Sequence, residues 1–163
     1  MNLRLAPLTA ATFASYGDVI ETAGHDHYPI NAGMAERYSD LAKIDVGNEG
    51  GRPLISLCQA KPVRLPLRLR LMERHPLSSQ AFIPLSTGPF LVVVAPAGPS
   101  PRSEDIRAFI SNGRQGVNYR AGTWHHPLLA LDQATDFLIV DRGGPGTNCD
   151  EIPIEERGIV ISA

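Results

Sequence analysis

The hydrophobic positions along this chain fall in short runs, and proline or glycine bounds most of them. The sequence contains 14 prolines and 15 glycines, spread over its whole length. That scatter is typical of many short strands joined by turns rather than of long helices. The strands predicted in this way are residues 17–21, 53–60, 66–75, 80–85, 89–96, 106–110, 116–120, 125–131, 136–142 and 157–163.

One short helix is predicted near the N-terminus, where Thr9 can cap two turns over residues 10–16 and Gly17 can end them. The loop of residues 132–135 is interpreted as a hairpin connection between the strands on either side. Residues 95–105 are expected to form a surface loop. Many strands at short spacing indicate a sandwich or barrel, and no interior linker is visible, so residues 1–163 are expected to form one all-β domain.

The stretch PLRLRLMERH, residues 66–75, alternates most regularly. Successive side chains on a strand face opposite ways, so its leucines are expected inward and its arginines outward. Continuing the count places Glu73 and His75 on the leucine face and Arg74 on the solvent side. Burying an unpaired carboxylate is costly. Glu73 and His75 are therefore interpreted either as a pair satisfied at the barrel rim or as part of a functional site.

Two adjacent histidines occur in RAGTWHHPLLAL, residues 120–131. Because neighbours on a strand face opposite ways, His125 is predicted to point into the barrel and His126 to the other face. His126 is interpreted as a hydrogen-bonded structural histidine. Trp124 is interpreted as a packing residue rather than a substrate platform.

Charge and composition exclude some function classes. The net charge of −2 provides no basic surface for a nucleic-acid backbone, so no nucleic-acid partner is expected. No apolar run reaches the length that a membrane helix needs, and the N-terminus lacks the apolar stretch of a signal peptide. A cytoplasmic protein without membrane contact is expected. Cys58 and Cys149 have no metal-binding spacing, and neither is expected to be a catalytic thiol.

Residues 73–88 and 120–125 resemble the two motifs of the cupin superfamily, H-x-H followed by E and G, and P-x-G-x-x-H. Glu73 and Gln80 replace a histidine and a glutamate of the first motif, and Arg120 replaces the proline of the second. The resemblance implies a cupin-like, double-stranded β-barrel of the jelly-roll type. It also implies that four side chains converge on one metal or ligand site: Glu73, His75, Gln80 and His125.

Four blocks, residues 31–41, 72–85, 116–131 and 136–151, look like the ureidoglycolate lyase family. That resemblance implies a homodimer. It also implies cleavage of (S)-ureidoglycolate to glyoxylate and urea, a step in allantoin and purine breakdown. The family is associated with a divalent metal, nickel, and the elimination is expected to be acid–base chemistry with or without the metal.

The expected chemistry suits the residues in the motifs. A base must take the hydroxyl proton of the substrate, and an acid must protonate the departing urea nitrogen. His75 or His125 can serve as either, because imidazole titrates near neutrality, and Glu73 can orient or balance one of them. A metal would instead be held by His75, Gln80 and His125 and polarise the hydroxyl.

The substrate carboxylate needs a clamp, for which a guanidinium has the best shape. Arg37, with Tyr38 beside it, is one hypothesis. Asn118 and Arg120 are the alternatives. Two other functions are weighed against the lyase: an amidohydrolase that releases ammonia from the same substrate, and a non-catalytic barrel that binds a small carboxylate.

Overall fold

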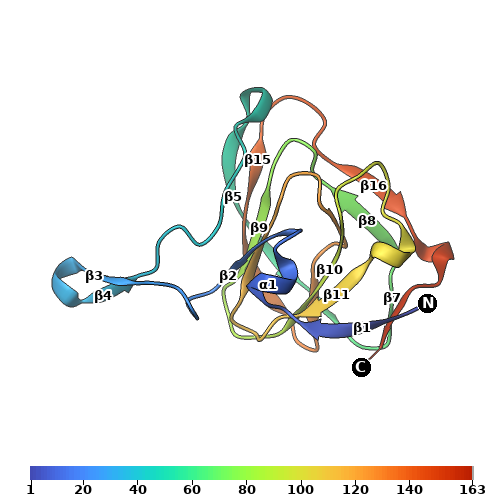
Figure 1. The fold of residues 1–163 in the computed structure, drawn as a ribbon, viewed down its shortest axis with the longest axis horizontal. Coiled ribbons are helices and arrows are strands. Elements are labelled where there is room, and N and C mark those ends of the chain that lie inside the picture. Colours follow the sequence, from blue (N-terminus) through green and yellow to red (C-terminus); the bar gives the residue numbers. More distant parts are fainter. Residues whose placement is uncertain (163) are drawn as a thin grey trace.

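The structure is a computed structural model, and it describes residues 1–162. Two curled β-sheets face each other around an apolar core and form a cupin-like β-barrel (Figure 1). The predicted all-β fold class is therefore confirmed, and the described residues include one turn of α-helix. In the same part of the chain, no helix has the length and apolar character needed to cross a bilayer.

The larger sheet has ten strands within the described residues. Its order is β16 (Asp150–Pro153), β8 (Leu71–Arg74), β13 (Trp124–His125), β10 (Phe90–Ala95), β11 (Arg107–Ile110), β1 (Asn2–Pro7), β17 (Val160–Ser162) and β7 (Leu67–Arg68), with β14 (Leu129–Leu131) beside β10 and β6 (Pro62–Val63) beside β14.

The smaller sheet has five strands, and a separate two-stranded sheet lies outside the barrel. The five-stranded order is β2 (Gly17–Ile20), β12 (Gly116–Tyr119), β9 (Gln80–Pro84), β15 (Thr135–Gly143) and β5 (Arg52–Ala60). The separate pair is β3 (Tyr28–Ile30) and β4 (Ala35–Arg37), joined by the 3₁₀ turn η1 (Asn31–Gly33). Other 3₁₀ turns are η2 (Asn48–Gly50), η3 (Ser103–Asp105) and η4 (Glu155–Arg157).

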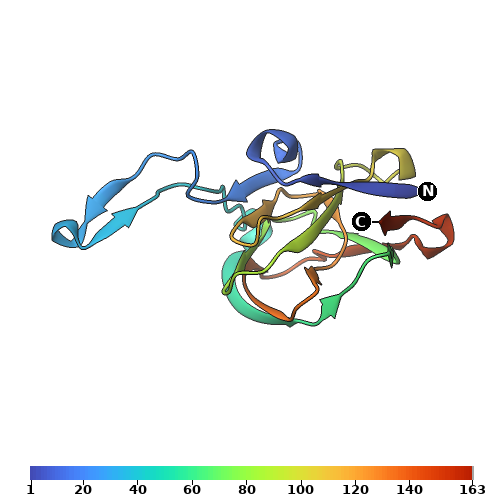
Figure 2. The same ribbon diagram turned by 90° about the horizontal axis from the view of Figure 1, so that it is seen from below.

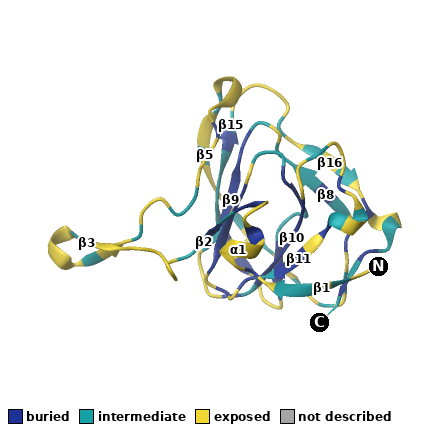
Figure 3. Ribbon diagram, viewed as in Figure 1, coloured by how far each residue is buried: buried dark blue, intermediate teal, exposed yellow. Residues whose placement is uncertain are grey.

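Strand β10 is buried along its whole length because both of its faces are covered, which explains its continuous apolar run. One face contributes to the barrel core between the two sheets, and the other to a second core behind the larger sheet. The barrel core contains Phe13, Phe82, Phe90, Val92, Val94, Phe109, Val117, Tyr119 and Phe137 among others. The second core contains Leu69, Met72, Leu91, Val93, Trp124, Ile154 and Ile161 among others. Figure 3 shows β10 as buried, together with the first part of β9.

Helix α1 (Ala10–Phe13) is shorter than predicted. Thr9 caps it as expected, with a reciprocal bond to Thr12. The helix ends early because Gly17 is already the first residue of β2, where its backbone passes so close to the carbonyl of Asn118 that no Cβ would fit. Gly17, predicted to end the helix, is thus the first residue of a strand, where its missing side chain allows the close approach of the neighbouring backbone.

The stretch of residues 66–75 is not one continuous strand. It is interrupted at Leu69–Arg70, between β7 and β8, so the alternation does not carry through. Leu69 and Met72, three residues apart, both lie in the second core, whereas Glu73 faces the barrel interior beside His125. The prediction that Glu73 shares a face with all three leucines is wrong, although Glu73 does point inward.

The interpretation of residues 132–135 as a hairpin loop is also wrong. Strand β14 pairs with β10 and β6 in the larger sheet, while β15 pairs with β9 and β5 in the smaller sheet. The connection therefore passes from one sheet to the other. Such crossings are how a jelly-roll barrel closes its core. Strands β1, β3, β4, β6 and β16 were not predicted from the sequence.

Candidate functional site

Glu73 and His125 form the centre of the site. Strands β8 and β13 are paired so that these two residues lie directly opposite each other. His125 Nε2 lies 3.3 Å from Glu73 Oε1, and the His125 side chain is 1% exposed. The Tyr119 ring stacks on the His125 ring, with centroids 4.2 Å apart and planes inclined by 9°. His125 is thereby fixed between an aromatic wall and a carboxylate.

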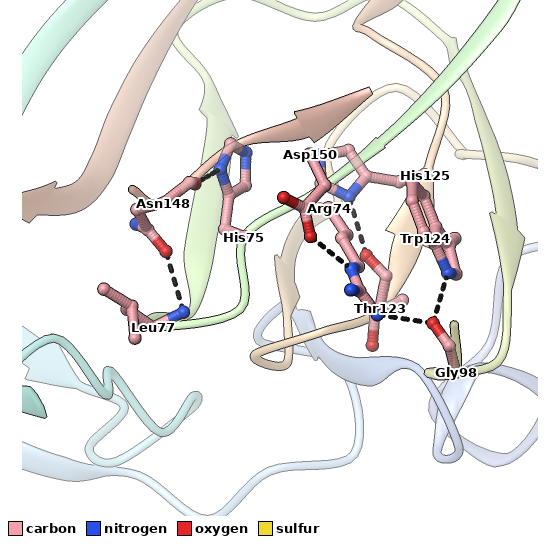
Figure 4. Close-up of polar contacts among 9 residues, drawn as sticks. All are labelled: Arg74, His75, Leu77, Gly98, Thr123, Trp124, His125, Asn148 and Asp150. Atoms are coloured by element: carbon pink, nitrogen blue, oxygen red, sulfur yellow. Dashed lines mark hydrogen bonds and ion pairs between the residues drawn. The ribbon is translucent and has the colours of Figure 1, made fainter. Parts of the chain in front are cut away.

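His75 follows β8 and lies next to this pair. Its ring centroid is 5.3 Å from that of His125. Its Nδ1 donates to the backbone oxygen of Asn148 at 2.6 Å, and its Nε2 lies 3.1 Å from Gln80 Oε1. The side chain of Asn148 in turn accepts from the backbone NH of Leu77 (Figure 4). The loop before β16 therefore determines the orientation of the His75 ring.

The hydrogen bonds define what each Nε2 atom requires. His125 Nδ1 donates to the backbone oxygen of Thr123 at 3.0 Å, as His75 Nδ1 does to Asn148. A carbonyl oxygen only accepts, so both Nδ1 atoms carry protons. Each Nε2 then faces another oxygen, Glu73 Oε1 or Gln80 Oε1. Two lone pairs facing each other are repulsive, so a proton or a metal cation on Nε2 would suit both positions; His125 Nε2 is buried and has no hydrogen-bond partner among the described residues.

The orientation of Gln80 supports this assignment. Its Nε2 donates to Asp141 Oδ2 at 3.3 Å, which leaves its Oε1 toward His75. The second oxygen of Asp141 is buried and has no hydrogen-bond partner among the described residues. Two carboxylates thus lie close to the two imidazoles: Glu73 beside His125, and Asp141 linked to His75 through Gln80.

The surroundings of Glu73 favour its ionised form. Burial alone would raise the pKa of Glu73, but the contact with His125, together with the charges of His75 and His126, outweighs burial and lowers the pKa. Burial and the charge of Glu73 raise the pKa of Tyr119, so this phenol stays neutral. Burial, followed by neighbouring carboxylates, raises the pKa of the Cys149 thiol, which argues against a catalytic thiolate there.

A cavity of about 420 Å³ opens beside His75. Gln80 and Asp141 line it from the smaller sheet, and the loop after β15 closes its other side. Glu73 and His125 lie behind His75 and are not among its lining residues. The remaining lining residues are Ser78, Arg142, Gly143, Gly144, Gly146, Thr147, Asn148 and Cys149.

The donor set fits a divalent metal. Glu73, His75 and His125 each offer one ligand atom, and these atoms all lie within 4.8 Å of one another. In protein metal sites, a ligating histidine usually donates its second ring nitrogen to a backbone carbonyl or carboxylate, as both histidines do here. Two imidazole nitrogens and a carboxylate oxygen suit a borderline ion such as nickel or zinc. The predicted ligand Gln80 lies beside this group.

Not all predicted site residues are brought together. Glu73, His75, Gln80 and His125 do lie together: His75 and Gln80 line the cavity, and Glu73 and His125 lie behind His75. Asn118 faces away from the barrel, where its Nδ2 donates to Asp18 and to the Lys43 backbone. Arg120 is exposed and donates to the Ala14 carbonyl. Both line a different cavity, of about 210 Å³, on the outer side of the sheet.

Arg37 and Tyr38 also lie away from the cavity of their own chain. Arg37 is the last residue of β4 and is exposed, on the hairpin that extends far from the barrel in Figure 1. The Tyr38 ring packs against the His27 ring of the same hairpin, with centroids 5.0 Å apart and planes tilted by 31°. Within a single chain, neither side chain reaches the cavity, so the expected carboxylate clamp is not formed there.

Several cavity residues were not predicted from the sequence. Asp141 lies at the end of β15, on the same face as Phe137 and Ile139 of the barrel core. Counting alternate positions from Phe137 would have placed its carboxylate inward, because β15 is one continuous strand. Asn148 and Arg142 carried no such signal, because Asn148 bonds Ser78, ahead of β9, and Arg142 bonds Asn48 in η2, and both contacts depend on how the loops fold.

Comparisons with known proteins support one family. A family model described as ureidoglycolate lyase matches residues 1–161. A ureidoglycolate lyase of Burkholderia mallei is 55% identical over 155 residues, which cover 95% of this chain and 91% of that protein. A ureidoglycolate lyase of Burkholderia cepacia is 57% identical, over 94% of this chain and 86% of that protein. A ureidoglycolate lyase of Pseudomonas aeruginosa is 54% identical, over 92% of this chain and 89% of that protein. This chain belongs to the ureidoglycolate lyase family.

Proposed function

We propose that this chain cleaves (S)-ureidoglycolate into glyoxylate and urea. One observation carries the proposal: in a chain of this family, an ionised carboxylate and two imidazoles meet beside a cavity that suits a small polar substrate. The reaction needs proton transfer at two atoms of one molecule. A cluster of three titratable groups supplies both a proton acceptor and a proton donor.

The elimination balances without a further reactant. The hydroxyl proton leaves as the carbon–oxygen double bond forms, and the carbon–nitrogen bond breaks with its electron pair going to nitrogen. That nitrogen then takes up a proton, which gives urea. We assign proton donation to His75, because it is the member of the cluster that lines the cavity. The Glu73–His125 pair behind it is assigned as the proton acceptor.

As the alternative to this acid–base assignment, we propose that the cluster binds a divalent metal and that its residues then serve as ligands rather than as proton donor and acceptor; nickel is the ion that the family resemblance suggests. Glu73, His75 and His125 would hold the ion, with Gln80 beside it. Bound there, it would act as a Lewis acid toward the substrate hydroxyl. Metal content of protein purified without added ions, together with activity before and after chelation, tests this proposal.

Turnover is tested by supplying racemic ureidoglycolate and following glyoxylate, urea and ammonia together. The expected result is glyoxylate and urea in equal amounts, from one enantiomer, with no ammonia. Release of ammonia instead would support the amidohydrolase reaction. No release of either product, with or without nickel, would contradict an enzymatic role on this substrate.

The remaining proposals concern assembly and location. We propose a homodimer, since large apolar side chains on the outer face of the smaller sheet, such as Ile55 at 75% exposure and Leu57 at 71%, have no cover within one chain as described. We propose a cytoplasmic location, an expectation that rests on the sequence; cell fractionation tests it.

A further inference from the structure

The hairpin formed by residues 26–40, here called the arm, has no support from its own barrel. Figures 1 and 2 show it extending away from the barrel in both views. Its side-chain bonds are internal, such as His27 to Glu36 and Tyr28 to Ser39, both at 2.8 Å. Within residues 1–162, no hydrogen bond or ion pair joins the arm to the rest of the chain. An isolated two-stranded hairpin is marginally stable in water.

The arm also exposes apolar surface. None of its residues is buried, and Met34 near its tip is 86% exposed. Tyr28 is 47% exposed. An extended, ordered hairpin with an apolar tip therefore needs a surface to pack on, and its own barrel does not provide one.

An uncovered apolar face lies on the same side of the molecule. The outward positions of β5, β15 and β9 are adjacent in the sheet, since Leu57 pairs with Leu138 and Leu138 with Ile83. Ile55 and Val140 are paired in the same way and continue this face. Figure 3 shows β5 as exposed, on the side from which the arm extends. The outward apolar face comprises Ile55, Leu57, Ile83, Leu138 and Val140.

The cavity lacks a free cation for the carboxylate of the substrate. Arg142 is the only guanidinium among its described lining residues. That group is 8% exposed and donates to the backbone oxygens of Asn48, Glu49 and Pro145, so it is committed to holding the loops. The arm, by contrast, carries Arg37, which is exposed and forms no ion pair within residues 1–162.

We propose that two copies of this chain pair about a twofold axis through their outward apolar faces, and that the arm of each copy crosses to the other and presents Arg37 to the substrate carboxylate in the partner's cavity. A twofold axis brings each uncovered face onto its equivalent and directs each arm toward the other barrel. Charge complementarity argues for this occupant, because the arm carries an uncommitted guanidinium and the cavity lacks one. The role of Arg37 rests on the proposed function; the pairing of the copies does not.

The pairing is tested without substrate by analytical ultracentrifugation of wild type and Leu57→Asp. Leu57 is 71% exposed in one chain, so the substitution leaves the folded barrel intact, which circular dichroism checks. Wild type is expected to sediment as a dimer and Leu57→Asp as a monomer. Arg70→Asp, at a side chain 78% exposed in the break between β7 and β8, is the matched control and is expected to remain dimeric. A monomeric wild type, or a dimeric Leu57→Asp, would overturn the pairing.

The role of Arg37 is tested by mixing two defects. Arg37→Ala is expected to remain dimeric and to lose roughly 10- to 100-fold in kcat/KM, mostly through KM, with partial recovery in Arg37→Lys. His75→Ala is expected to be inactive. When Arg37→Ala and His75→Ala chains are co-expressed with different tags and purified through both, each mixed dimer contains one cavity with His75 and with Arg37 of the partner subunit. About half the wild-type activity is expected.

The outcomes separate the two proposals. If Arg37 acts within its own chain or not at all on the substrate, the mixed dimers gain no activity over what the parental variants predict, and the crossing arm is overturned. If wild type itself releases no glyoxylate, the proposed function fails and the role of Arg37 fails with it. The ultracentrifugation result still decides the pairing in that case.

Discussion

At the scale of single residues, Glu73 faces His125 across two paired strands, 3.3 Å from its Nε2. Glu73→Gln keeps the size of the side chain but removes its charge and places a donor or a weak acceptor against the imidazole. Turnover of ureidoglycolate is expected to fall roughly 100- to 10,000-fold, the range typical of a lost general acid or base. Glyoxylate release checks this result, with thermal unfolding to verify that the barrel is intact.

Glu151→Gln provides a matched control for that substitution. Glu151 lies directly opposite Glu73 in the β16–β8 pair but is exposed. Glu73 also has carboxylate and thiol neighbours on that side, because Glu73, Cys149 and Glu151 bring their ligand atoms within 4.8 Å of one another. An equal loss in Glu151→Gln would move the reacting cluster to the exposed side of β8 and contradict the assignment to His75 and His125.

Asp141 is the second carboxylate of the site, and it acts through Gln80. By accepting from Gln80 Nε2, it leaves Gln80 Oε1 toward His75. Asp141→Asn removes the charge that fixes the amide, so the His75 ring loses a defined partner. Activity is expected to fall roughly 10- to 100-fold, as for outer partners of catalytic histidines. Asp136→Asn, on the same strand but exposed, should retain wild-type kinetics; a similar loss in both variants would point to the strand rather than to the amide.

At the scale of elements, the start of β2 depends on Gly17. Its φ is 155°, and a Cβ at this position would overlap the carbonyl of Asn118 in the neighbouring strand. Gly17→Ala must therefore push β2 away from β12. A loss of roughly 2–4 kcal/mol in the free energy of unfolding is expected from urea titration. Gly47→Ala is the control, because its Cβ would meet open space at a negative φ; it should lie within about 0.5 kcal/mol of wild type.

Strands could be predicted where one stretch of chain carries its own pattern. Strand β10 is a single apolar run because it lies between two cores, and the ends of β9 and β15 follow from their proline and turn residues. The interruption of the strand at Leu69–Arg70 could not be predicted, because it goes with the packing of Met72 in the second core. The other residues of that core, such as Trp124, are distant in sequence. The transfer of β15 to the other sheet likewise depends on pairing with β5, far away in sequence.

The same distinction applies to the site. Glu73 and His75 could be found because they follow a stretch of alternating leucines, and His125 because it precedes an apolar run. Asn118 could not be assigned to a face by its motif, because Tyr119 beside it takes the inward position against His125. The family-like stretch of residues 31–41 identified Arg37 as a candidate, but its position in space could not be predicted. That position depends on a hairpin that extends away from the barrel. Contacts made outside a segment, or outside the chain, are not encoded in that segment's own pattern.

At the scale of the whole molecule, the outward apolar face links stability to assembly. If two copies cover Ile55 and Leu57 for each other, unfolding must also separate the copies, and mass action then favours the folded dimer at higher concentration. The melting temperature of wild type is expected to rise by roughly 1–4 °C for each tenfold increase in protein concentration.

Leu57→Asp separates this effect from the intrinsic stability of the barrel. In this variant the melting temperature should be lower than that of wild type at high concentration and should not change with concentration, because a monomer unfolds without dissociating. Differential scanning calorimetry over a hundredfold range of concentration measures both proteins. If the melting temperature of wild type stays constant over that range, the outward apolar face is not covered by a second copy in solution. The barrel is then stable as a monomer with this face exposed to water.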